Sequence, residues 1–247
     1  MRWLLMAAGA LNFGVQAWYF THMLQLNSYR PERYKKWCTD NDKKLVTVRR
    51  LLPFLCVFTL WLHNRVPDYA LYAISAGLVL LTALLNLPKK AKKPLVVTPR
   101  VWRLFVTEGL IGVVLLALTW FTLPMRGLGL LGLGQMIIWI WVGAANYINL
   151  PIEKKIAAGY VKQARQLLDS MPELTVIGVT GSYGKTSVKS FLAALLGVKY
   201  NVLMTPGSYN TTMGVVRTVR EQLRPSHQIF IAEMGAKKTG DIREICE

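Results

Sequence analysis

The sequence of 247 residues is poor in acidic side chains and in cysteine. It has 13 Asp and Glu residues against 30 Lys and Arg, and only 17% of its residues are charged whereas 53% are hydrophobic. The three cysteines, Cys38, Cys56 and Cys246, are too few and too scattered to form a disulfide-stabilised scaffold. So small a charged fraction does not fit a uniformly soluble enzyme. The composition instead indicates a chain of two different parts.

The two parts divide near residue 150. Residues 1–150 contain 17 of the basic and 5 of the acidic residues, and the basic ones form clusters between apolar stretches. Residues 151–247 contain 13 basic and 8 acidic residues in a pattern typical of soluble α/β proteins. The net charge of +17 could indicate nucleic-acid binding. Because the basic residues lie beside apolar stretches, attraction to anionic lipid headgroups explains them more simply. We expect a lipid bilayer as partner and no nucleic acid.

Five apolar stretches are candidate membrane spans, since a helix needs about 20 apolar residues to cross the hydrocarbon core. None of them contains Lys or Arg. The second stretch is short, and the first could instead be a cleaved signal peptide, although its basic cluster follows the apolar run. The five stretches are residues 3–23, 51–63, 69–87, 104–123 and 128–148.

The basic residues predict the orientation, because Lys and Arg that flank a span are retained in the cytoplasm. Eighteen of them flank the predicted spans on one side of the membrane, and only Arg2, Arg65 and Arg126 fall on the other side. We therefore predict that the N-terminus lies outside and that residues 151 onward lie in the cytoplasm.

The second part begins with a predicted amphipathic helix. Pro151 suits a first helical position, and apolar residues recur at helical spacing as far as Leu168. Residues 151–172 therefore predict a connecting helix, and residues 173–247 a separate domain. In that domain a β-branched run at 175–180 predicts a buried parallel strand, and residues 200–204 and 228–232 predict two more. Helices are predicted at 188–198 and 215–223.

A glycine-rich turn directly follows the first predicted strand. A strand, a glycine-rich turn, a Lys-Thr pair and a helix together form the architecture that binds nucleotide phosphates. We expect Lys185 to reach the β- and γ-phosphates and the Thr186 hydroxyl to join the coordination sphere of Mg²⁺. Val179 stands where the usual pattern has its first glycine, which indicates a particular subgroup of these loops. An ordinary strand-to-helix turn is the alternative. The candidate nucleotide-binding residues are Gly181, Ser182, Tyr183, Gly184, Lys185, Thr186 and Ser187.

Two further loops are expected at the same edge of the sheet. Glu233 ends the third predicted strand, where a carboxylate can hold Mg²⁺ directly or through water. The alternative for Glu233 is a solvated carboxylate at a strand end. The polar loop at 205–214 contains Asn210 and follows the second strand, where an α/β sheet presents loops to a ligand.

Three segments together resemble the central ATP-binding domain of the Mur ligase family, whose members build the peptide stem of bacterial peptidoglycan. The match is closest to the branch of that family that adds D-alanyl-D-alanine, and it covers about residues 174–247. The segments are TGSYGKTSVK at 180–189, TPGSYNTTMGV at 205–215 and EMGAKKTGDI at 233–242.

The resemblance implies an ATP-dependent acid–amino-acid ligase that forms an amide through an acyl phosphate. Its implied substrates are a UDP-MurNAc-peptide and D-Ala-D-Ala, and its implied cofactors are ATP and Mg²⁺. Carried over to this sequence, it implies a catalytic role for Lys185 at the transferred phosphoryl group. It also implies metal ligation by Thr186 and Glu233 and a substrate-facing position for Asn210. Together with the predicted spans, it gives an expected location in the bacterial cytoplasmic membrane.

Two features depart from the family pattern. A membrane domain stands where family members usually have a soluble domain for the UDP-sugar. The chain also stops at Glu247, so we expect a fragment of a longer protein that is inactive alone. The predicted fold is an α-helical multi-pass membrane domain followed by an α/β P-loop domain with a parallel sheet that is incomplete at the C-terminus.

Two other functions remain open from the sequence. One is a related amide ligase of the polyglutamate or folylpolyglutamate type, which the segments at 205–215 and 233–236 fit less well. The other is a non-catalytic, membrane-anchored nucleotide-binding regulator of wall synthesis. The intact Lys185, Thr186 and Glu233 favour an enzyme.

Overall fold

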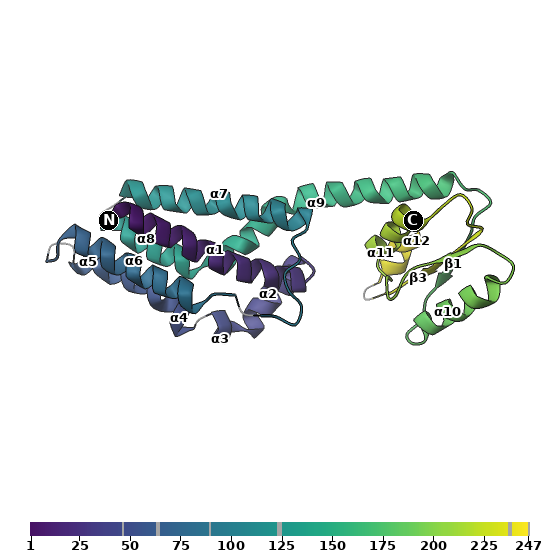
Figure 1. Ribbon diagram of the computed structural model, residues 1–247, viewed down its shortest axis with the longest axis horizontal. Helices are drawn as coiled ribbons and strands as arrows, with labels where there is room; N and C mark the ends of the chain where they lie inside the picture. The colour runs from purple at the N-terminus through teal and green to yellow at the C-terminus, as the bar shows by residue number, and fades with distance from the viewer. Residues whose placement is uncertain (46, 63–64, 89, 123–124, 237–238, 247) are drawn as a thin grey trace. The chain divides into compact units, whose positions relative to one another are not determined.

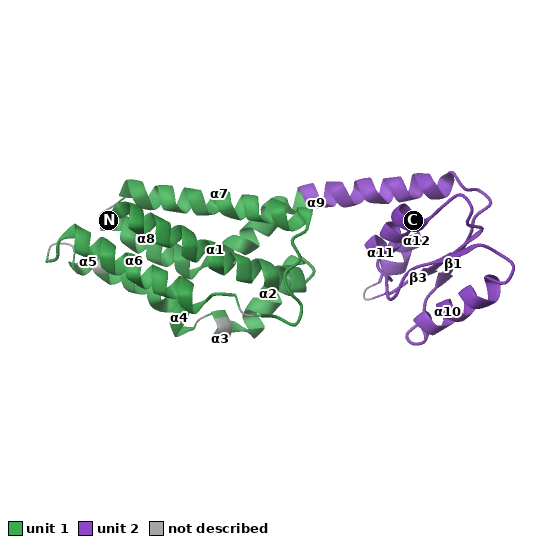
Figure 2. Ribbon diagram, viewed as in Figure 1, with its two compact units in different colours: residues 1–151 green, residues 152–247 purple. Residues whose placement is uncertain are grey.

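A computed structural model of the chain divides into two compact units, residues 1–151 and 152–247 (Figure 2). It describes residues 1–45, 47–62, 65–88, 90–122, 125–236 and 239–246. The predicted span ends His63 and Leu123, the basic residue Lys89 and the last residue, Glu247, lie outside the described residues.

Unit 1 is built from helices in the part of the chain that the structure describes (Figure 1). Shorter helical segments lie between the long helices α1 and α6, the long helix α7 follows α6, and the unit closes with α8 and the first part of α9. The elements are α1 (Arg2–Leu26), α2 (Pro31–Asp40), α3 (Asp42–Leu45), α4 (Val48–Leu51), the 3₁₀ helix η1 (Leu52–Phe58), α5 (Thr59–Leu62), α6 (Asp68–Leu85), α7 (Pro99–Thr122), α8 (Met125–Met136) and α9 (Ile138–Asp169).

Two of the described helices, α6 and α7, are long and apolar enough to cross a membrane. A third span results if α8 and α9 count together as one bent span. Helix α1 has 25 residues, but Asn12, Gln16 and Thr21 are buried against its neighbours and lower its hydropathy. The number of five spans stays a prediction.

The core of unit 1 forms on both sides of α1. Phe20 packs in one cluster with Leu104 of α7 and Ile138 of α9, and Leu5 packs in a second cluster with Leu71 of α6. Polar pairs lie among these apolar contacts. The amide of Asn12 donates to Gln135 Oε1 at 2.7 Å, and the hydroxyl of Thr21 donates to Glu108 Oε1 at 2.6 Å. Such pairing offsets the cost of burying these polar groups.

Helix α9 differs from the two separate elements predicted for its sequence. The predicted span at 128–148 is broken, because α8 ends at Met136 and α9 begins at Ile138, with a bend of 71° between the two helices. Helix α9 then continues through Pro151, which lies inside the helix and not at its start. A proline removes one backbone donor, yet the helix is continuous on both sides of Pro151. The predicted connecting helix at 151–172 is thus the second part of α9.

Unit 2 contains a parallel sheet in the order β1-β3-β2. Its central strand, β3 (Ile229–Glu233), is buried along its whole length. β1 (Thr175–Val179) and β2 (Val202–Met204) lie on either side of it. The predicted parallel sheet is confirmed. Helices α10 (Lys185–Leu196) and α11 (Thr212–Gln222) each begin three residues before their predicted starts. Helix α12 (Asp241–Cys246) follows β3.

Both faces of this sheet carry helices. On one face, Ile229 and Ile231 of β3 pack with Leu192 of α10. On the other face, Phe230 packs with α11 and with the last turns of α9, through Ala164. The alternation along β3 follows from the two-residue period of a strand. Because all three strands are parallel, the loops that follow them meet at one edge of the sheet.

Helix α10 leaves apolar side chains in water on its far side. Val188, Phe191 and Leu195 are exposed, and their spacing of three and four residues places them on one face. We call these three residues the α10 strip. In the sheet, β1 is an edge strand among the described strands.

Candidate nucleotide site

The turn between β1 and α10 depends on its glycines. Gly184 has a φ of 75°, in the left-handed region that favours glycine, and it immediately precedes the first residue of α10. Gly181, with a φ of 154°, also takes a positive value. The turn therefore presents the first backbone N–H groups of α10, which lack partners within the helix and suit an anion.

Lys185 lies at the first position of α10, and its ammonium group contacts the turn itself. It donates to the carbonyl of Gly181 at 2.5 Å and to that of Ser182 at 3.4 Å. The side chain of Tyr183 is 96% exposed, and Ser182 and Ser187 are exposed as well. The turn is thus accessible to a ligand from solvent, and Lys185 lies within it.

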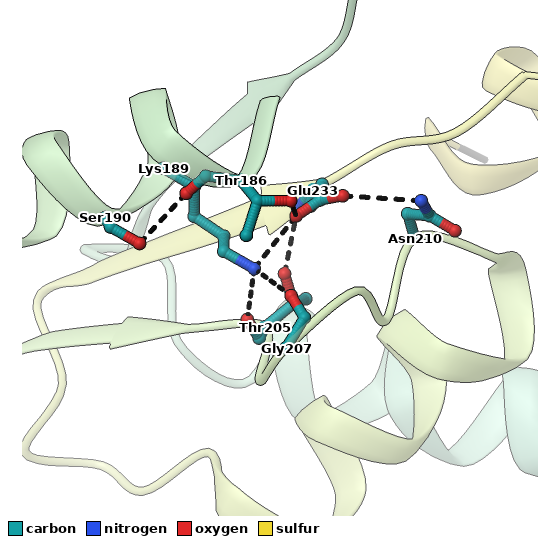
Figure 3. Close-up of polar contacts among 7 residues, drawn as sticks. All are labelled: Thr186, Lys189, Ser190, Thr205, Gly207, Asn210 and Glu233. Atoms are coloured by element: carbon teal, nitrogen blue, oxygen red, sulfur yellow. Dashed lines mark hydrogen bonds and ion pairs between the residues drawn. The ribbon is translucent and has the colours of Figure 1, made fainter. Parts of the chain in front are cut away.

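Thr186 and Glu233 meet although 47 residues separate them in sequence. The Thr186 hydroxyl donates to Glu233 Oε2 at 3.0 Å, as Figure 3 shows. Glu233 is the last residue of β3 and is 1% exposed. The structure therefore brings the two predicted metal ligands together at the carboxyl edge of the sheet.

Lys189 completes this arrangement from one turn further along α10. Its ammonium group lies 2.9 Å from Glu233 Oε2, and the side chains of both residues are buried. It also donates to the carbonyls of Thr205 at 2.7 Å and Gly207 at 2.5 Å (Figure 3). One side chain therefore joins α10, the end of β3 and the loop after β2.

Asn210 reaches the same carboxylate from the loop after β2. Its amide donates to Glu233 Oε1 at 3.3 Å, and its backbone carbonyl accepts a 2.8 Å hydrogen bond from the N–H of Gly235. A Cβ atom on Gly235 would lie 2.9 Å from Asn210 Cγ, so only glycine allows this approach. Below them the buried Thr205 hydroxyl accepts from the N–H of Glu233 at 3.0 Å. Each oxygen of the Glu233 carboxylate thus has at least one donor.

The surroundings of Glu233 keep its carboxylate ionised. Burial by itself would raise the pKa of Glu233, but hydrogen bonds from Lys189, Thr186 and Asn210 and the positive charge of Lys189 outweigh it. The net result is a pKa below the usual glutamate range. The site therefore retains an anionic oxygen group at neutral pH.

The residues present fit a magnesium ion that is shared with a phosphate ligand. A hydroxyl and a carboxylate oxygen 3.0 Å apart can enter one coordination sphere, because Mg²⁺ bonds to oxygen at about 2.1 Å in octahedral geometry. No group of three or more His, Cys, Asp or Glu side chains in the described part of the chain could hold a metal. The set consequently fits an ion that takes its other ligands from phosphate and water.

Sequence reasoning assigns no role to Lys189 or Thr205. The signal for Lys189 is its distance of four residues from Lys185, which places both on one face of a helix that begins at residue 185. Thr205 carries no comparable signal. Its hydroxyl matters only because β2 lies beside β3.

The last part of the chain is similar to known proteins. Residues 179–247 match the family model described as Mur ligase middle domain. The chain is also similar to proteins named UDP-N-acetylmuramoyl-tripeptide--D-alanyl-D-alanine ligase. The one from Synechocystis sp. is 44% identical over 69 residues, 28% of this chain and 15% of the relative. The one from Escherichia coli is 42% identical over 67 residues, 27% of this chain and 15% of the relative.

A third relative with the same name, from Treponema pallidum, is 36% identical over 76 residues, 31% of this chain and 16% of the relative. The chain thus spans 14–16% of the length of the curated relatives that it matches. No solved structure matches the chain. The resemblance predicted from the three motifs is confirmed, and residues 179–247 are related to the middle domain of the Mur ligase family.

Proposed function

We propose that this chain is part of an ATP-dependent ligase of peptidoglycan precursor synthesis, which joins D-Ala-D-Ala to a UDP-MurNAc-tripeptide. The observation that carries the proposal is the convergence of Thr186, Lys189 and Asn210 on Glu233, beside the turn that holds Lys185. The same segment matches the Mur ligase middle domain, and the relatives named for this ligation are similar to the chain over 69 and 67 residues.

In this proposal the turn and the start of α10 bind the phosphates of ATP. The backbone N–H groups at the helix N-terminus and the ammonium group of Lys185 neutralise the charge of the transferred phosphoryl group. Thr186 and Glu233 hold Mg²⁺, which when bound supplies further charge neutralisation. Lys189 and Asn210 act as positioning residues, because they fix the Glu233 carboxylate.

The ligation proceeds in two steps. The carboxylate of the muramoyl peptide attacks the γ-phosphorus of ATP, and ADP leaves to give an acyl phosphate. The amine of D-Ala-D-Ala then attacks the acyl carbon, loses a proton and releases inorganic phosphate. Phosphoryl transfer requires mainly positioning and charge stabilisation, which are what Lys185 and the Thr186–Glu233 pair offer.

The proposal includes a membrane anchor. Apolar helices such as α6 and α7 in residues 1–150 would lie in the bacterial cytoplasmic membrane, with the N-terminus outside and unit 2 in the cytoplasm. The asymmetric placement of Lys and Arg supports this orientation. A membrane anchor would keep the ATP-binding unit close to the cytoplasmic surface of the lipid bilayer.

Mg-ATP binding by the full chain in lipid nanodiscs tests the nucleotide site. We expect saturable binding that weakens when EDTA removes Mg²⁺. No measurable affinity for Mg-ATP in folded, membrane-embedded protein would refute the proposal. Ligation itself is tested on the full gene product, which should convert UDP-MurNAc-tripeptide and D-Ala-D-Ala to UDP-MurNAc-pentapeptide with release of ADP. ATP binding without any such product would favour a non-catalytic nucleotide-binding regulator.

A further inference from the structure

A cavity in unit 1 lies outside the residues of the nucleotide site. Its volume is about 740 Å³, within the range of small-molecule sites. It lies between the last turns of α1, the helix α4 and the segment that follows α6. The lining residues are Trp18, Tyr19, His22, Met23, Thr47, Arg49, Arg50, Leu85, Asn86, Leu87, Pro88, Lys90, Ala91, Pro94 and Leu95. We call this space the α1–α4 cavity.

The charge of the α1–α4 cavity has one sign. Arg49, Arg50 and Lys90 line it, and none of its described lining residues is Asp or Glu. Arg50 is only 7% exposed, and its guanidinium lies 4.6 Å from the ring centre of Tyr19 and 4.7 Å from that of Phe20. Cation–π contacts of this kind hold the guanidinium in place. The cavity thus has a fixed cation in its wall and two further cations beside it.

The remaining wall of the α1–α4 cavity is apolar. Trp18, Leu85 and Leu87 contribute side chains to it, and the Arg49 guanidinium is tied to this wall by a 3.2 Å hydrogen bond to the Leu85 carbonyl. A ligand that fills the cavity would therefore contact both cations and hydrocarbon side chains. Tryptophan and tyrosine are enriched at the depth of lipid headgroups, which fits Trp18 and Tyr19.

The segment after α6 is fastened to α1 and does not simply lie over it. His22 Nε2 is hydrogen-bonded to the carbonyl of Lys93 at 2.7 Å. Gln25 and Val96 make a reciprocal pair, in which the Gln25 amide donates to the Val96 carbonyl at 2.8 Å and Gln25 Oε1 accepts from the Val96 N–H at 3.0 Å. These bonds give the cavity a defined wall.

We propose that the α1–α4 cavity binds the phosphate headgroup of an anionic phospholipid, with Arg49, Arg50 and Lys90 facing the phosphate and Trp18 and Leu87 facing the first carbons of the acyl chains. Basic pockets between membrane helices on the cytoplasmic side are suited to such headgroups. This inference rests on the membrane anchor in the proposed function and goes beyond the ligase activity.

Lipid retention by the full chain in a mild neutral detergent tests the proposal. Native mass spectrometry is used to titrate phosphatidylglycerol and, in parallel, phosphatidylcholine with the same acyl chains. The test variant is R49Q/K90Q, which removes two cations from the cavity and leaves the packed Arg50 in place. The matched control is R33Q/K36Q, which removes two exposed cations from the same predicted side of the membrane but outside the cavity lining.

We expect the unmodified chain and the control to bind phosphatidylglycerol in preference to phosphatidylcholine. In R49Q/K90Q the affinity for phosphatidylglycerol should fall about 30-fold. Each Lys or Arg near an anionic lipid raises the affinity roughly five- to sixfold, and the variant loses two of them. Its affinity for phosphatidylcholine, in which choline offsets the charge of the phosphate, should fall much less. Near-equal losses in the control would indicate a diffuse surface effect and overturn the proposal, as would equal binding of the two lipids.

One further arm separates a lipid headgroup from a free phosphate. Inorganic phosphate is added at the concentration at which phosphatidylglycerol saturates the chain. It should not displace the bound phosphatidylglycerol, and complete displacement would overturn the lipid assignment. The Mg-ATP affinity of the same samples depends on unit 2, so its loss would count against the nucleotide site and not against this cavity. A chain that stays dispersed without detergent would refute the membrane anchor by a separate observation.

Discussion

The ammonium nitrogen of Lys189 lies 2.9 Å from Oε2 of Glu233, and both side chains are almost completely buried. A buried ion pair is not by itself a source of stability, because both charges lose their hydration. Here two backbone carbonyls satisfy the other donors of Lys189, and Thr186 and Asn210 satisfy the carboxylate. The pair therefore fixes the position of the Glu233 carboxylate at the end of β3.

Lys189→Met should destabilise unit 2 by about 3–5 kcal/mol, since it leaves the Glu233 carboxylate buried without its cation. Hydrogen–deuterium exchange of the β3 amides in the full chain measures this loss. Lys199→Met is the matched control, because Lys199 is exposed and its ammonium lies near the ring of Tyr200. Unchanged protection of β3 in Lys189→Met would contradict the structural role of the pair.

The stability of unit 2 should depend on pH through Glu233. The pKa of Glu233 is lowered in the folded state, whereas a glutamate in an unfolded chain has a pKa of about 4.3. The stabilisation is therefore fully present above that pH and is lost as the pH falls through the lower, folded-state pKa. Exchange of β3 amides, corrected for intrinsic rates at each pH, measures it. Glu233→Gln should lack this pH-dependent increment, and an identical profile in both proteins would argue against it.

Lys185→Ala should weaken Mg-ATP binding by at least about tenfold, because it removes a charge-assisted contact to phosphate. The fold should survive, as the Lys185 ammonium group donates to carbonyls of its own turn, those of Gly181 and Ser182. Isothermal titration of the chain in nanodiscs gives the affinity. Lys199→Ala, which removes an exposed lysine of the same unit, should bind as the unmodified chain does. Equal affinities in all three proteins would remove Lys185 from the site.

Thr186→Val should reduce nucleotide affinity only when Mg²⁺ is present. The change keeps the shape of the side chain and removes the hydroxyl that meets Glu233 at 3.0 Å. Titrations in Mg²⁺ and in EDTA separate the two contributions. Ser190→Ala is a suitable control, because the Ser190 hydroxyl on the same helix donates to the Thr186 carbonyl and not to Glu233. A loss of equal size in EDTA would show that the hydroxyl does not act through the metal.

Labelling of Cys246 with a membrane-impermeant thiol reagent should report the orientation. Cys38 and Cys56 are buried, so the exposed Cys246 of unit 2 is the informative thiol. It should stay unlabelled in whole cells and react in inverted vesicles. Arg65→Cys in a Cys246→Ser background places a thiol at an exposed position on the predicted outer side and should give the opposite result. Labelling of Cys246 in intact cells would reverse the predicted orientation.

The nucleotide turn and the sheet can be predicted because their signals are local. The turn that contains Gly184, Lys185 and Thr186 directly follows a β-branched run, and that order suffices to predict the turn and the start of a helix. The meeting of Thr186 with Glu233 is also accessible, since parallel strands end at one edge. These inferences need only strand order and the spacing within motifs.

Other features depend on contacts between distant segments. Lys189 acquires its role because the loop at 205–207 approaches α10, and no local pattern encodes that approach. The sequence does not predict the break between α8 and α9, because the apolar pattern runs through Ile137 and the nearby Gly132 and Gly134 lie inside α8 and not at the break. The intrinsic preference of Pro151 is for a helix start, but the helix on both sides of it is continuous.

The α10 strip has a practical consequence for those who handle the protein. Phe191 and Leu195 expose two thirds or more of their surface to water, at 67% and 72%. Exposed hydrophobic patches of this kind promote aggregation as the protein concentration rises. We expect light scattering from the full chain in detergent to rise steeply with concentration, and Phe191→Ser or Leu195→Gln to suppress that rise without changing the turn between β1 and α10.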